Sequence, residues 1–284
     1  MPLVFEGVSY SYGDDRLALR DIDLRIEDGE FVGLIGHTGS GKSTLTQLMN
    51  ALIIPTRGRV TVDGMDTAQR SLRRCIRERV GLVFQYPESQ LFATTVAEDV
   101  AFGPKNLGLS DGEVERRCRR ALERVGFSYD EFAQRSPFEL SGGQKRRIAL
   151  AGVLAMEPQV LVLDEPAAGM DPQTVEEIRG LLRTLNDEGL TIVLVSHSMD
   201  DVAQLCGRVI VMNGGSVLMQ GAPGEVFSEE HAAELRRINL GLPRATKFAI
   251  ELAHKGFELE GPVLDSEQLA DALAGALRKG NSTR

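Results

Sequence analysis

The stretch that decides the fold of this chain reads Phe31-Val32-Gly33-Leu34-Ile35-Gly36-His37-Thr38-Gly39-Ser40-Gly41-Lys42-Ser43-Thr44. Its second part fits the pattern of a phosphate-binding loop, in which a glycine is followed by four residues and then by glycine, lysine and serine. The apolar residues before the loop predict a buried strand, and Leu45–Met49 after it predict a helix. Backbone amides in such a loop and the positive end of the helix dipole attract phosphate oxygens. We therefore expect residues 36–44 to bind a nucleoside triphosphate, with Lys42 at the β- and γ-phosphates and Ser43 as a ligand of Mg²⁺.

Composition limits the class of protein. The chain has 284 residues, 42% of them hydrophobic, which is enough for one large or two modest domains with cores. Its formal net charge of −9 disfavours sequence-independent binding to nucleic acid. The three cysteines, Cys75, Cys118 and Cys206, fit no metal-ligand spacing, and we expect reduced thiols. Neither a secretory signal nor an apolar run near the roughly 20 residues of a membrane span occurs, so we expect membrane association only through a partner or a surface.

Strand patterns alternate with helix patterns over much of the chain. Two continuous apolar runs, Val160–Leu163 and Thr191–Val195, are separated by a helix that we expect to begin near Pro172. Continuous apolar strands joined by helices are typical of a parallel sheet covered on both faces. Shorter strands are predicted earlier, at Leu3–Phe5, Ile22–Ile26, Gly58–Gly64 and Val80–Phe84, with a helix at Gln69–Arg79.

Two regions lack strand patterns. From about residue 98 to residue 150 the pattern is helical, and Val114–Val125 reads as an amphipathic helix. Past Val226, helices are predicted at Glu229–Ile238, Phe248–His254 and Ser266–Leu277, before an end that we expect to be disordered from Gly280. We divide the chain into residues 1–225, with a helical subdomain at about 98–150, and a C-terminal helical extension, residues 226–284.

The apolar run that begins at Val160 ends in Asp164 and Glu165. Ligands of open parallel sheets bind at the carboxyl ends of the strands. Asp164 is suited to hold Mg²⁺, and Glu165 is placed to polarise a water molecule as a general base. The alternative is a pair of exposed acids at a strand end.

A second motif, Leu140-Ser141-Gly142-Gly143-Gln144, opens a predicted helix at Lys145–Ala155. A serine and bare backbone amides at a helix N-terminus form an anion-binding surface. One γ-phosphate does not require two such surfaces, so we interpret this one as serving the nucleotide of a second subunit. The alternative is a simple helix cap.

Together these motifs resemble the ATP-binding cassette (ABC) ATPases over roughly residues 3–225. The loop at 36–44, the Leu140–Gln144 motif and the Val160–Glu165 motif match the family's phosphate loop, signature motif and second nucleotide motif. One departure is Ala167-Ala168-Gly169-Met170, where the family more often has a threonine at the second position and a leucine before the aspartate, Asp171. The resemblance implies an α/β fold: a phosphate-loop NTPase with a mainly parallel core sheet, an N-terminal antiparallel β subdomain, a helical subdomain and a small C-terminal helical extension.

The resemblance also implies roles for single residues, with ATP and Mg²⁺ as ligands. Catalysis would fall to Glu165, to Gln85 of the glutamine loop and to His197, the switch histidine. Mg²⁺ would be held by Ser43, Gln85 and Asp164. The nucleotide-binding residues would be Tyr12, which stacks on adenine, together with Gly36, His37, Thr38, Gly39, Ser40, Gly41, Lys42, Ser43, Thr44, Ser141, Gly142, Gly143, Gln144 and Asp171.

Several of these residues have simpler alternatives. Tyr12 fits a core aromatic, Gln85 an ordinary loop amide and His197 a structural histidine. The arginines from Arg116 to Arg124 alternate with glutamates, which favours a solvated helix face over a nucleic-acid patch.

The stretch after Gln85 narrows the resemblance. Several segments resemble the ATPases of energy-coupling factor (ECF) importers, and most closely the second of their two ATPase subunits. These segments are Tyr86–Phe92, Val96–Asn106, Arg135–Glu139, Ala151–Pro158 and Leu240–Pro243. This implies a peripheral protein on the cytoplasmic side of the cell membrane that pairs with a second, different ABC ATPase. Its other partners would be a transmembrane coupling protein and small membrane substrate-binding proteins that take up vitamins or other micronutrients, and nucleic acid would not be one.

The resemblance further implies a groove near the glutamine loop for helices of the coupling protein. Phe84, Leu91 and Phe92 are suited to such a contact, although Phe84 also fits ordinary core packing. Two other functions stay open: a dedicated cobalt or nickel importer ATPase that acts as a homodimer, and a soluble ABC ATPase that moves no solute.

Overall fold

The structure is a computed structural model that describes residues 2–13, 17–257, 259 and 261–282. Its contacts divide the chain into two compact units. The first consists of residues 1–30 and 43–195, and the second of residues 31–42 and 196–284. The predicted division at residue 225 into a cassette and an extension stays a prediction.

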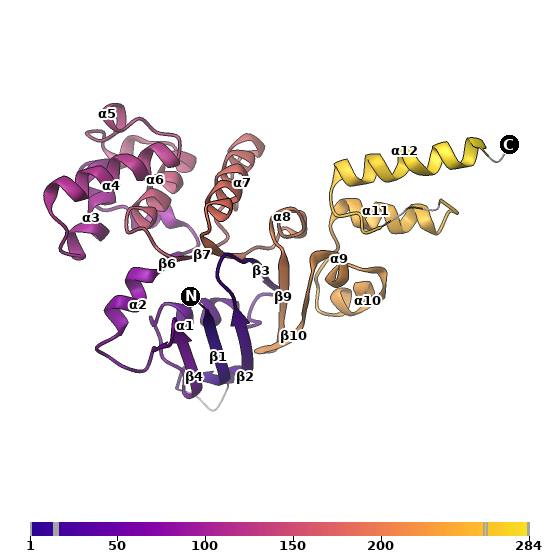
Figure 1. Ribbon diagram of the computed structural model, residues 1–284, viewed down its shortest axis with the longest axis horizontal. Coiled ribbons are helices and arrows are strands. Elements are labelled where there is room, and N and C mark those ends of the chain that lie inside the picture. The colour runs from indigo at the N-terminus through magenta and orange to yellow at the C-terminus, as the bar shows by residue number, and fades with distance from the viewer. Residues whose placement is uncertain (1, 14–16, 258, 260, 283–284) are drawn as a thin grey trace. The chain divides into compact units, whose positions relative to one another are not determined.

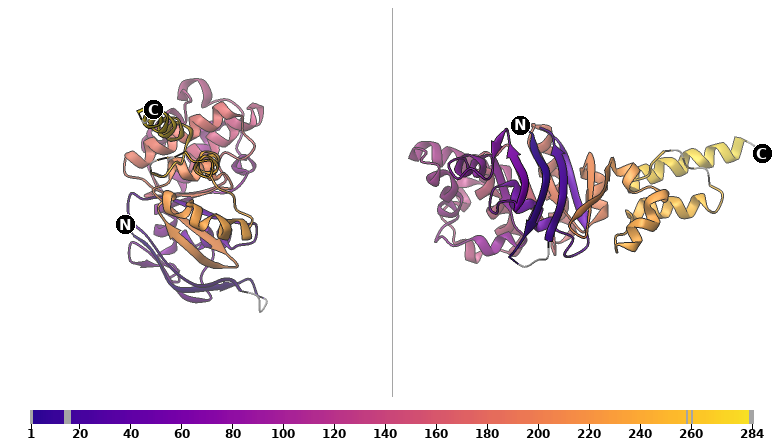
Figure 2. Two further views of the ribbon diagram at one scale, coloured as in Figure 1. Left: turned by 90° about the vertical axis from the view of Figure 1, so that its right-hand side faces the viewer. Right: turned by 90° about the horizontal axis from the view of Figure 1, so that it is seen from below.

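The first unit begins with an antiparallel sheet, whose strands lie side by side (Figures 1 and 2). Its strands are β1 (Leu3–Ser11), β2 (Leu17–Ile26), β4 (Arg57–Val62) and β5 (Met65–Asp66), in the order β2-β1-β4-β5. β1 runs well past the predicted Leu3–Phe5, because register shifts after Phe5 interrupt the apolar alternation on which that prediction rested. The N-terminal antiparallel β subdomain is thus confirmed.

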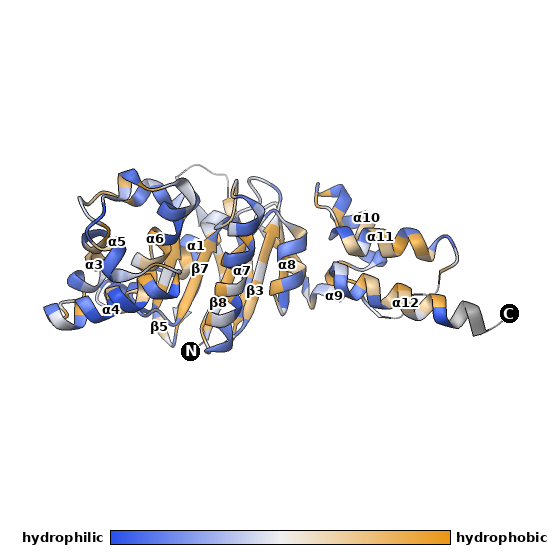
Figure 3. Cartoon of the chain, turned by 90° about the horizontal axis from the view of Figure 1, so that it is seen from above, coloured by the Kyte–Doolittle hydropathy of each residue, from blue (hydrophilic) through white to orange (hydrophobic). Residues whose placement is uncertain are grey.

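Parallel strands make the cores of both units. In the first unit β6 (Val80–Val83), β7 (Val160–Asp164) and β8 (Thr191–Val195) pair in parallel, and Leu161, Val162 and Leu163 are fully buried. In the second unit β3 (Phe31–Gly36) pairs in parallel with β9 (Arg208–Asn213), and β9 pairs antiparallel with β10 (Ser216–Gly221). Figure 3 shows β3 and β7 as hydrophobic. The mainly parallel core is confirmed.

The first unit carries most of its helices between β6 and β8. They are α3 (Val96–Asn106), α4 (Asp111–Arg124), α5 (Tyr129–Phe132), α6 (Gly142–Leu154) and α7 (Pro172–Asp187), with 3₁₀ turns η1 (Pro87–Gln90) and η2 (Pro137–Glu139). The helices α3 and α4 pack on α6 (Figure 1). Earlier in the chain come α1 (Lys42–Met49) and α2 (Arg73–Arg79). The start of α2 is four residues later than predicted, because residues 69–72 form turns that are closed by hydrogen bonds such as Leu72 N to Gln69 O.

The arginines of α4 are held in ion pairs. Arg116 and Arg117 both bind Glu113, and Arg119 binds Asp130. Arg120 and Arg124 bind Glu157 and Glu188. Arg116 and Arg120 are exposed, whereas Arg117, Arg119 and Arg124 are half-buried, so the predicted solvated face holds for part of the helix.

In the second unit one helix, α8 (Met199–Leu205), lies before β9, and the other described helices follow β10. They are α9 (Pro223–Val226), α10 (Glu229–Arg237), α11 (Arg244–Ala253) and α12 (Ser266–Ser282). A small apolar cluster of Ala245, Ala249 and Val263 lies beside α12 residues Leu269 and Ala272. The backbone of α12 is helical to Ser282, so the disorder predicted from Gly280 was wrong as far as that residue; Thr283 and Arg284 lie outside the described residues. Among the helices that the structure describes, none is long and apolar enough to cross a membrane.

The three cysteines differ in exposure, and the difference predicts how readily each will react. Cys75 is exposed, whereas Cys118 and Cys206 are buried, and all three are free thiols. Burial raises the pKa of Cys118 to about 11 and also raises the pKa of Cys206. Because the thiolate is the reactive form, an alkylating reagent at pH 8 will label Cys75 in the folded chain and all three thiols after denaturation. Mass spectrometry of the labelled peptides measures this, and labelling of Cys118 as fast as Cys75 in the folded chain would contradict the burial.

Candidate active site

The predicted phosphate loop joins β3 to α1 in the tight conformation that its glycines allow. A Cβ atom on Gly36 would lie 2.5 Å from both the Met212 carbonyl oxygen and Ser40 Oγ, so a larger residue does not fit. Gly41 has a φ of 106°, which favours glycine. Lys42, the first residue of α1, is buried, and its Nζ donates to the carbonyl oxygens of Gly36 at 2.6 Å and His37 at 3.1 Å. The loop therefore curls around the lysine ammonium.

The turn between β9 and β10 contacts this loop within the second unit. The amide of Gly215 donates to the Ser40 carbonyl oxygen at 3.0 Å. The ring of His37 lies between two partners, with Nε2 3.1 Å from Asn213 Oδ1 and Nδ1 2.8 Å from the Thr38 carbonyl oxygen. Thr38 and Gly39 are exposed at the loop surface, where a phosphate would meet them.

In the first unit the acid pair meets two other predicted residues. Asp164 is the last residue of β7, and its Oδ2 accepts a hydrogen bond from Ser43 Oγ at 3.4 Å. Glu165 follows, and its Oε2 accepts from Gln85 Nε2 at 3.1 Å. The backbone of Glu165 has a φ of 52°, a left-handed conformation that costs energy for a non-glycine residue and often occurs at functional sites. Four residues predicted for metal binding and catalysis are thus paired at the carboxyl ends of β6 and β7.

The donor atoms at this position fit a magnesium ion bound with a triphosphate. Mg²⁺ prefers oxygen ligands and is usually held by one or two carboxylates together with substrate phosphates. Ser43 and Asp164 supply a hydroxyl and a carboxylate within hydrogen-bond distance of each other. Over the described ranges no group of three or more His, Cys, Asp or Glu side chains could hold a metal.

Tyr12 lies just after β1 and is 63% exposed, so it is not a core residue. Its hydroxyl shares a hydrogen bond with Thr44 Oγ1 at 3.1 Å, and its ring meets the ring of Tyr10 edge-on at 4.8 Å. Thr44 is itself buried and follows the proposed magnesium ligand Ser43. The ring is thereby anchored to α1 with its surface open to solvent, while its stacking on adenine stays a prediction.

The predicted signature motif begins α6. Ser141 is the N-cap residue: its Oγ accepts from Gln144 N at 3.3 Å, and its own amide donates to Gln144 Oε1 at 3.0 Å. Ser141 and Gly142 are exposed, and Gly143 is half-buried. Ser141 is therefore a helix cap, as the alternative held. The exposed amides of the same helix terminus can also bind an anion, and that role stays a prediction.

Asp171 caps the next helix, α7. Its carboxylate accepts from Thr174 N at 3.0 Å and from Thr174 Oγ1 at 2.6 Å, and these bonds lower the pKa of Asp171. A Cβ on Gly143 would lie 3.6 Å from Thr174 Cγ2, so the N-termini of α6 and α7 are neighbours. Thr174 has no distinctive signal in the sequence, since a threonine in the first turn of a helix is common.

His197 lies in the second unit, two residues after the end of β8, and is exposed. The preceding residue, Ser196, is buried, and its Oγ accepts from Ser198 N at 3.0 Å. The switch role of His197 stays a prediction.

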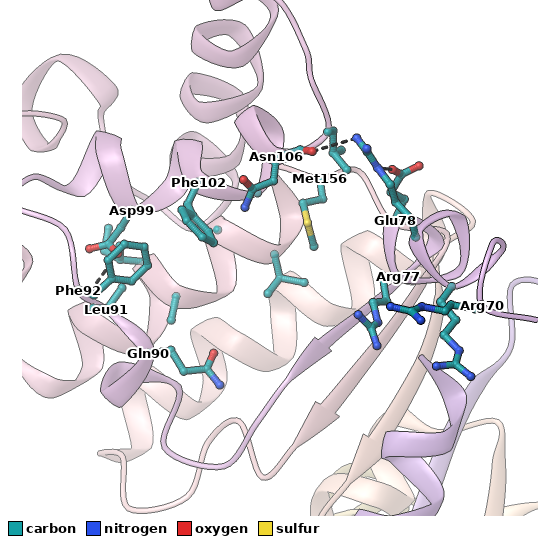
Figure 4. Close-up of a pocket in the computed structure, with 18 residues that line it drawn as sticks. Arg70, Arg77, Glu78, Gln90, Leu91, Phe92, Asp99, Phe102, Asn106 and Met156 are labelled. Carbon is teal, nitrogen blue, oxygen red and sulfur yellow. Dashed lines mark hydrogen bonds and ion pairs between the residues drawn. The ribbon is translucent and has the colours of Figure 1, made fainter. Parts of the chain in front are cut away.

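A groove of about 840 Å³ lies beside the glutamine loop in the first unit (Figure 4). Leu91, Phe92, Phe102 and Met156 give it an apolar side, and arginines of α2 such as Arg77 lie opposite. Phe92 and Phe102 are 61% and 51% exposed and pack edge-on at 5.0 Å. Phe84 is half-buried and is not among the residues that line the groove, so the structure does not decide between its suggested contact and core packing.

Arg146 is a further residue that the sequence analysis does not single out. It stands in the run Lys145-Arg146-Arg147, which is typical of an exposed helix, yet only 9% of its surface is accessible. It contacts both the turn after Gln85 and the loop after Glu165. No local pattern in the sequence could have shown these contacts.

Comparisons with known proteins give consistent matches over the chain. Residues 19–168 match the family described as ABC transporter. The energy-coupling factor transporter ATP-binding protein EcfA2 of Symbiobacterium thermophilum is 54% identical over 99% of this chain and 99% of that protein.

Two solved structures share the fold. One is cbiO1 from Clostridium perfringens, described as part of the ABC transporter complex cbiONQ; it is 41% identical, with a TM-score of 0.74 over 87% of this chain and 98% of that chain. The other is a dimeric, post-hydrolysis state of the ATP-binding cassette MJ0796 bound to ADP and Pi. It is 31% identical, with a TM-score of 0.69 over 78% of this chain and 98% of that chain.

Proposed function

This chain belongs to the ATP-binding proteins of energy-coupling factor transporters within the ABC transporter family, and from that membership we propose that it hydrolyses ATP to power an importer. The observation that carries the proposal is the pairing of Gln85 with Glu165 beside that of Ser43 with Asp164. These pairs put a candidate general base and candidate metal ligands next to the start of α1, where Lys42 enters the phosphate loop.

The chain's own residues have distinct tasks in this proposal. The loop amides and Lys42 hold the triphosphate, and the exposed ring of Tyr12 stacks on the base. Ser43, Asp164 and Gln85 would hold Mg²⁺, which would supply positive charge to offset that of the triphosphate. Glu165 accepts a proton from the attacking water, with Gln85 and His197 orienting it.

We further propose that two ATPase subunits enclose two nucleotides. The exposed N-terminus of α6, with Ser141, Gly142, Gly143 and Gln144, then meets the γ-phosphate bound by the second subunit. Asp171 caps the neighbouring helix α7, and we infer that this cap fixes the conformation of the surface next to the N-terminus of α6. Closure assembles each site from two chains, and hydrolysis reopens it, so the nucleotide shifts the population between the two states.

The groove beside the glutamine loop is the surface that we propose for a transmembrane coupling protein. Its exposed aromatic pair, Phe92 and Phe102, can receive the apolar face of a short helix. The chain would then lie at the cytoplasmic side of the cell membrane as a peripheral subunit. Small membrane substrate-binding proteins would choose the solute, a vitamin or another micronutrient.

Affinity purification of the tagged chain from detergent-solubilised membranes of its native cell, followed by mass spectrometry, tests this proposal. We expect a second ABC ATPase, a coupling membrane protein and several small membrane proteins. A single membrane set without a second ATPase would favour the dedicated cobalt or nickel importer. Recovery of no membrane protein would favour a soluble ABC ATPase and overturn the proposal.

A variant in the groove sharpens the same experiment. Phe92→Glu will lose the membrane proteins and keep the second ATPase, because a carboxylate cannot enter an apolar contact without a large desolvation cost. Leu218→Glu is the matched control, since Leu218 is also an exposed apolar residue but lies on β10. Equal recovery of membrane proteins with Phe92→Glu and with the unmodified chain would remove the groove from the proposed contact.

A further inference from the structure

Arg146 is a buried cation in the helix that begins at Ser141. It lies in the second turn of α6, and 9% of its surface is accessible. Its guanidinium has partners on two other segments. Nε donates to Glu88 Oε2 at 2.8 Å and Nη2 to Glu88 Oε1 at 3.3 Å, while Nη1 donates to the Ala168 carbonyl oxygen. One side chain thus joins three segments of the first unit.

Each of those two other segments carries a residue of the proposed chemistry. Glu88 lies in η1, three residues after Gln85. Between them Tyr86 has a left-handed backbone, with a φ of 57°, and its ring centroid lies 5.7 Å from the Arg146 guanidinium. Ala168 lies three residues after Glu165, and its amide donates to the Glu165 carbonyl oxygen at 3.3 Å. Arg146 therefore holds both the loop of Gln85 and the loop of Glu165.

The chemistry of this contact requires arginine. A planar guanidinium can bind both oxygens of a carboxylate and still donate to a carbonyl, whereas a lysine ammonium is a point charge that cannot span the three acceptors. Burial acts to raise the pKa of Glu88. Hydrogen bonds from Arg146 and from the backbone of Glu88, together with the positive charge of Arg146, outweigh burial, so the pKa of Glu88 is lowered. The carboxylate is thus ionised and the pair is charged at neutral pH.

We propose that Arg146 is a positioning residue for hydrolysis, which ties the placement of Ser141 to the placement of Gln85 and Glu165. The inference rests on the proposed function, because it requires two ATPase subunits that share nucleotide sites. Ser141 serves the nucleotide of the second subunit, whereas Gln85 and Glu165 serve the nucleotide of this chain. Because Arg146 holds all three segments, its loss misplaces the residues that serve both nucleotides.

This link predicts that one substitution affects two nucleotide sites. In a complex that carries Glu165→Gln in this chain, only the partner's site still turns over ATP. In a complex whose partner has lost its catalytic glutamate, only this chain's site does so. Adding Arg146→Lys to either complex will lower its kcat by roughly 10- to 100-fold, the scale of a small misplacement of catalytic groups. The affinity for ATP, measured with labelled nucleotide, will stay within about twofold, because Arg146 touches no nucleotide-binding residue.

Glu88→Gln provides a second, milder variant. It removes the ion pair and leaves the Arg146 bond to Ala168 possible, so it will lower kcat at this chain's site. If Arg146 acts there through Glu88, the double variant Glu88→Gln with Arg146→Lys will be no slower than Arg146→Lys alone.

Arg147→Lys is the matched control. Arg147 stands on the same helix; it is half-buried, ion-paired to Glu177 at 3.1 Å, and packed on the ring of Phe127 at 4.5 Å. It touches neither catalytic loop, so its substitution will leave kcat at both sites within about twofold, whatever it does to the melting temperature. If Arg146→Lys hydrolyses ATP like the control at either site, the inference is overturned. If the unmodified complex does not hydrolyse ATP at all, the proposed function fails, and the inference fails with it.

Discussion

Replacing Glu165 by glutamine will slow ATP hydrolysis at this chain's own site by about 10²–10⁴-fold and leave ATP binding intact, because general-base catalysis contributes about this much. The substitution keeps the size of the side chain and its acceptor oxygen, so Gln85 can still donate to it as it now donates to Glu165 Oε2. It removes only the capacity to take a proton. Phosphate release in complexes whose partner ATPase has lost its own catalytic glutamate measures the rate, and filter binding of labelled ATP measures the affinity.

Glu157→Gln is the control for backbone strain and for the loss of one negative charge. Glu157 has a φ of 53°, close to the 52° of Glu165, but it lies after α6 and pairs with Arg117 and Arg120. Exposed ion pairs contribute little, so its loss will leave hydrolysis within about twofold. Near-normal turnover with Glu165→Gln would remove Glu165 from the role of general base.

Local signals were sufficient for the parts of the fold and site that are contiguous in sequence. The predicted strand Thr191–Val195 is apolar from Ile192 onward and is followed by the polar residue Ser196, and β8 has the predicted limits. The phosphate loop could be predicted because its glycines and lysine are adjacent, and the close fit around Gly36 shows why that glycine is needed. The prediction that Ser43 is a magnesium ligand follows from the same stretch.

Contacts between distant segments could not be predicted in this way. Gln85 and Glu165 are separated by 80 positions, and the resemblance to a family, not the residues themselves, led to their common role. Arg146 is the stronger example, since a charged residue in a basic run predicts exposure and the structure buries it. Its burial depends on Glu88 and on a backbone carbonyl at Ala168, neither of which has a signal in the sequence.

Phe84 shows a further limit of local signals. Its place between an apolar strand and the glutamine loop suggested a contact surface, yet its side chain turns out not to line the groove. A residue one position past a strand can face either side, and alternation along a short, fully buried strand does not decide which. Leu91 and Phe92, which lie after the 3₁₀ turn, do reach the groove.

Replacing Ser141 by aspartate will abolish most of the turnover at the partner's nucleotide site and spare this chain's own site. Aspartate caps a helix as well as serine does, so α6 will keep its start at Gly142. Its carboxylate, however, will face the γ-phosphate that the helix terminus is proposed to meet. Like charges at a close contact cost several kcal/mol, which corresponds to a loss of roughly 10²–10³-fold in kcat/KM at that site.

Ser141→Asn separates capping from anion binding, because asparagine caps equally well and carries no charge. In complexes where only the partner's site retains its glutamate, Ser141→Asn will lose far less activity than Ser141→Asp. In complexes where only this chain's site retains its glutamate, both variants will turn over ATP within about threefold of the unmodified chain, since Ser141 does not touch that nucleotide. If aspartate and asparagine behave alike at the partner's site, Ser141 is a helix cap and nothing more. If aspartate slows this chain's own site instead, the signature motif acts within its own chain and two subunits do not share their nucleotide sites.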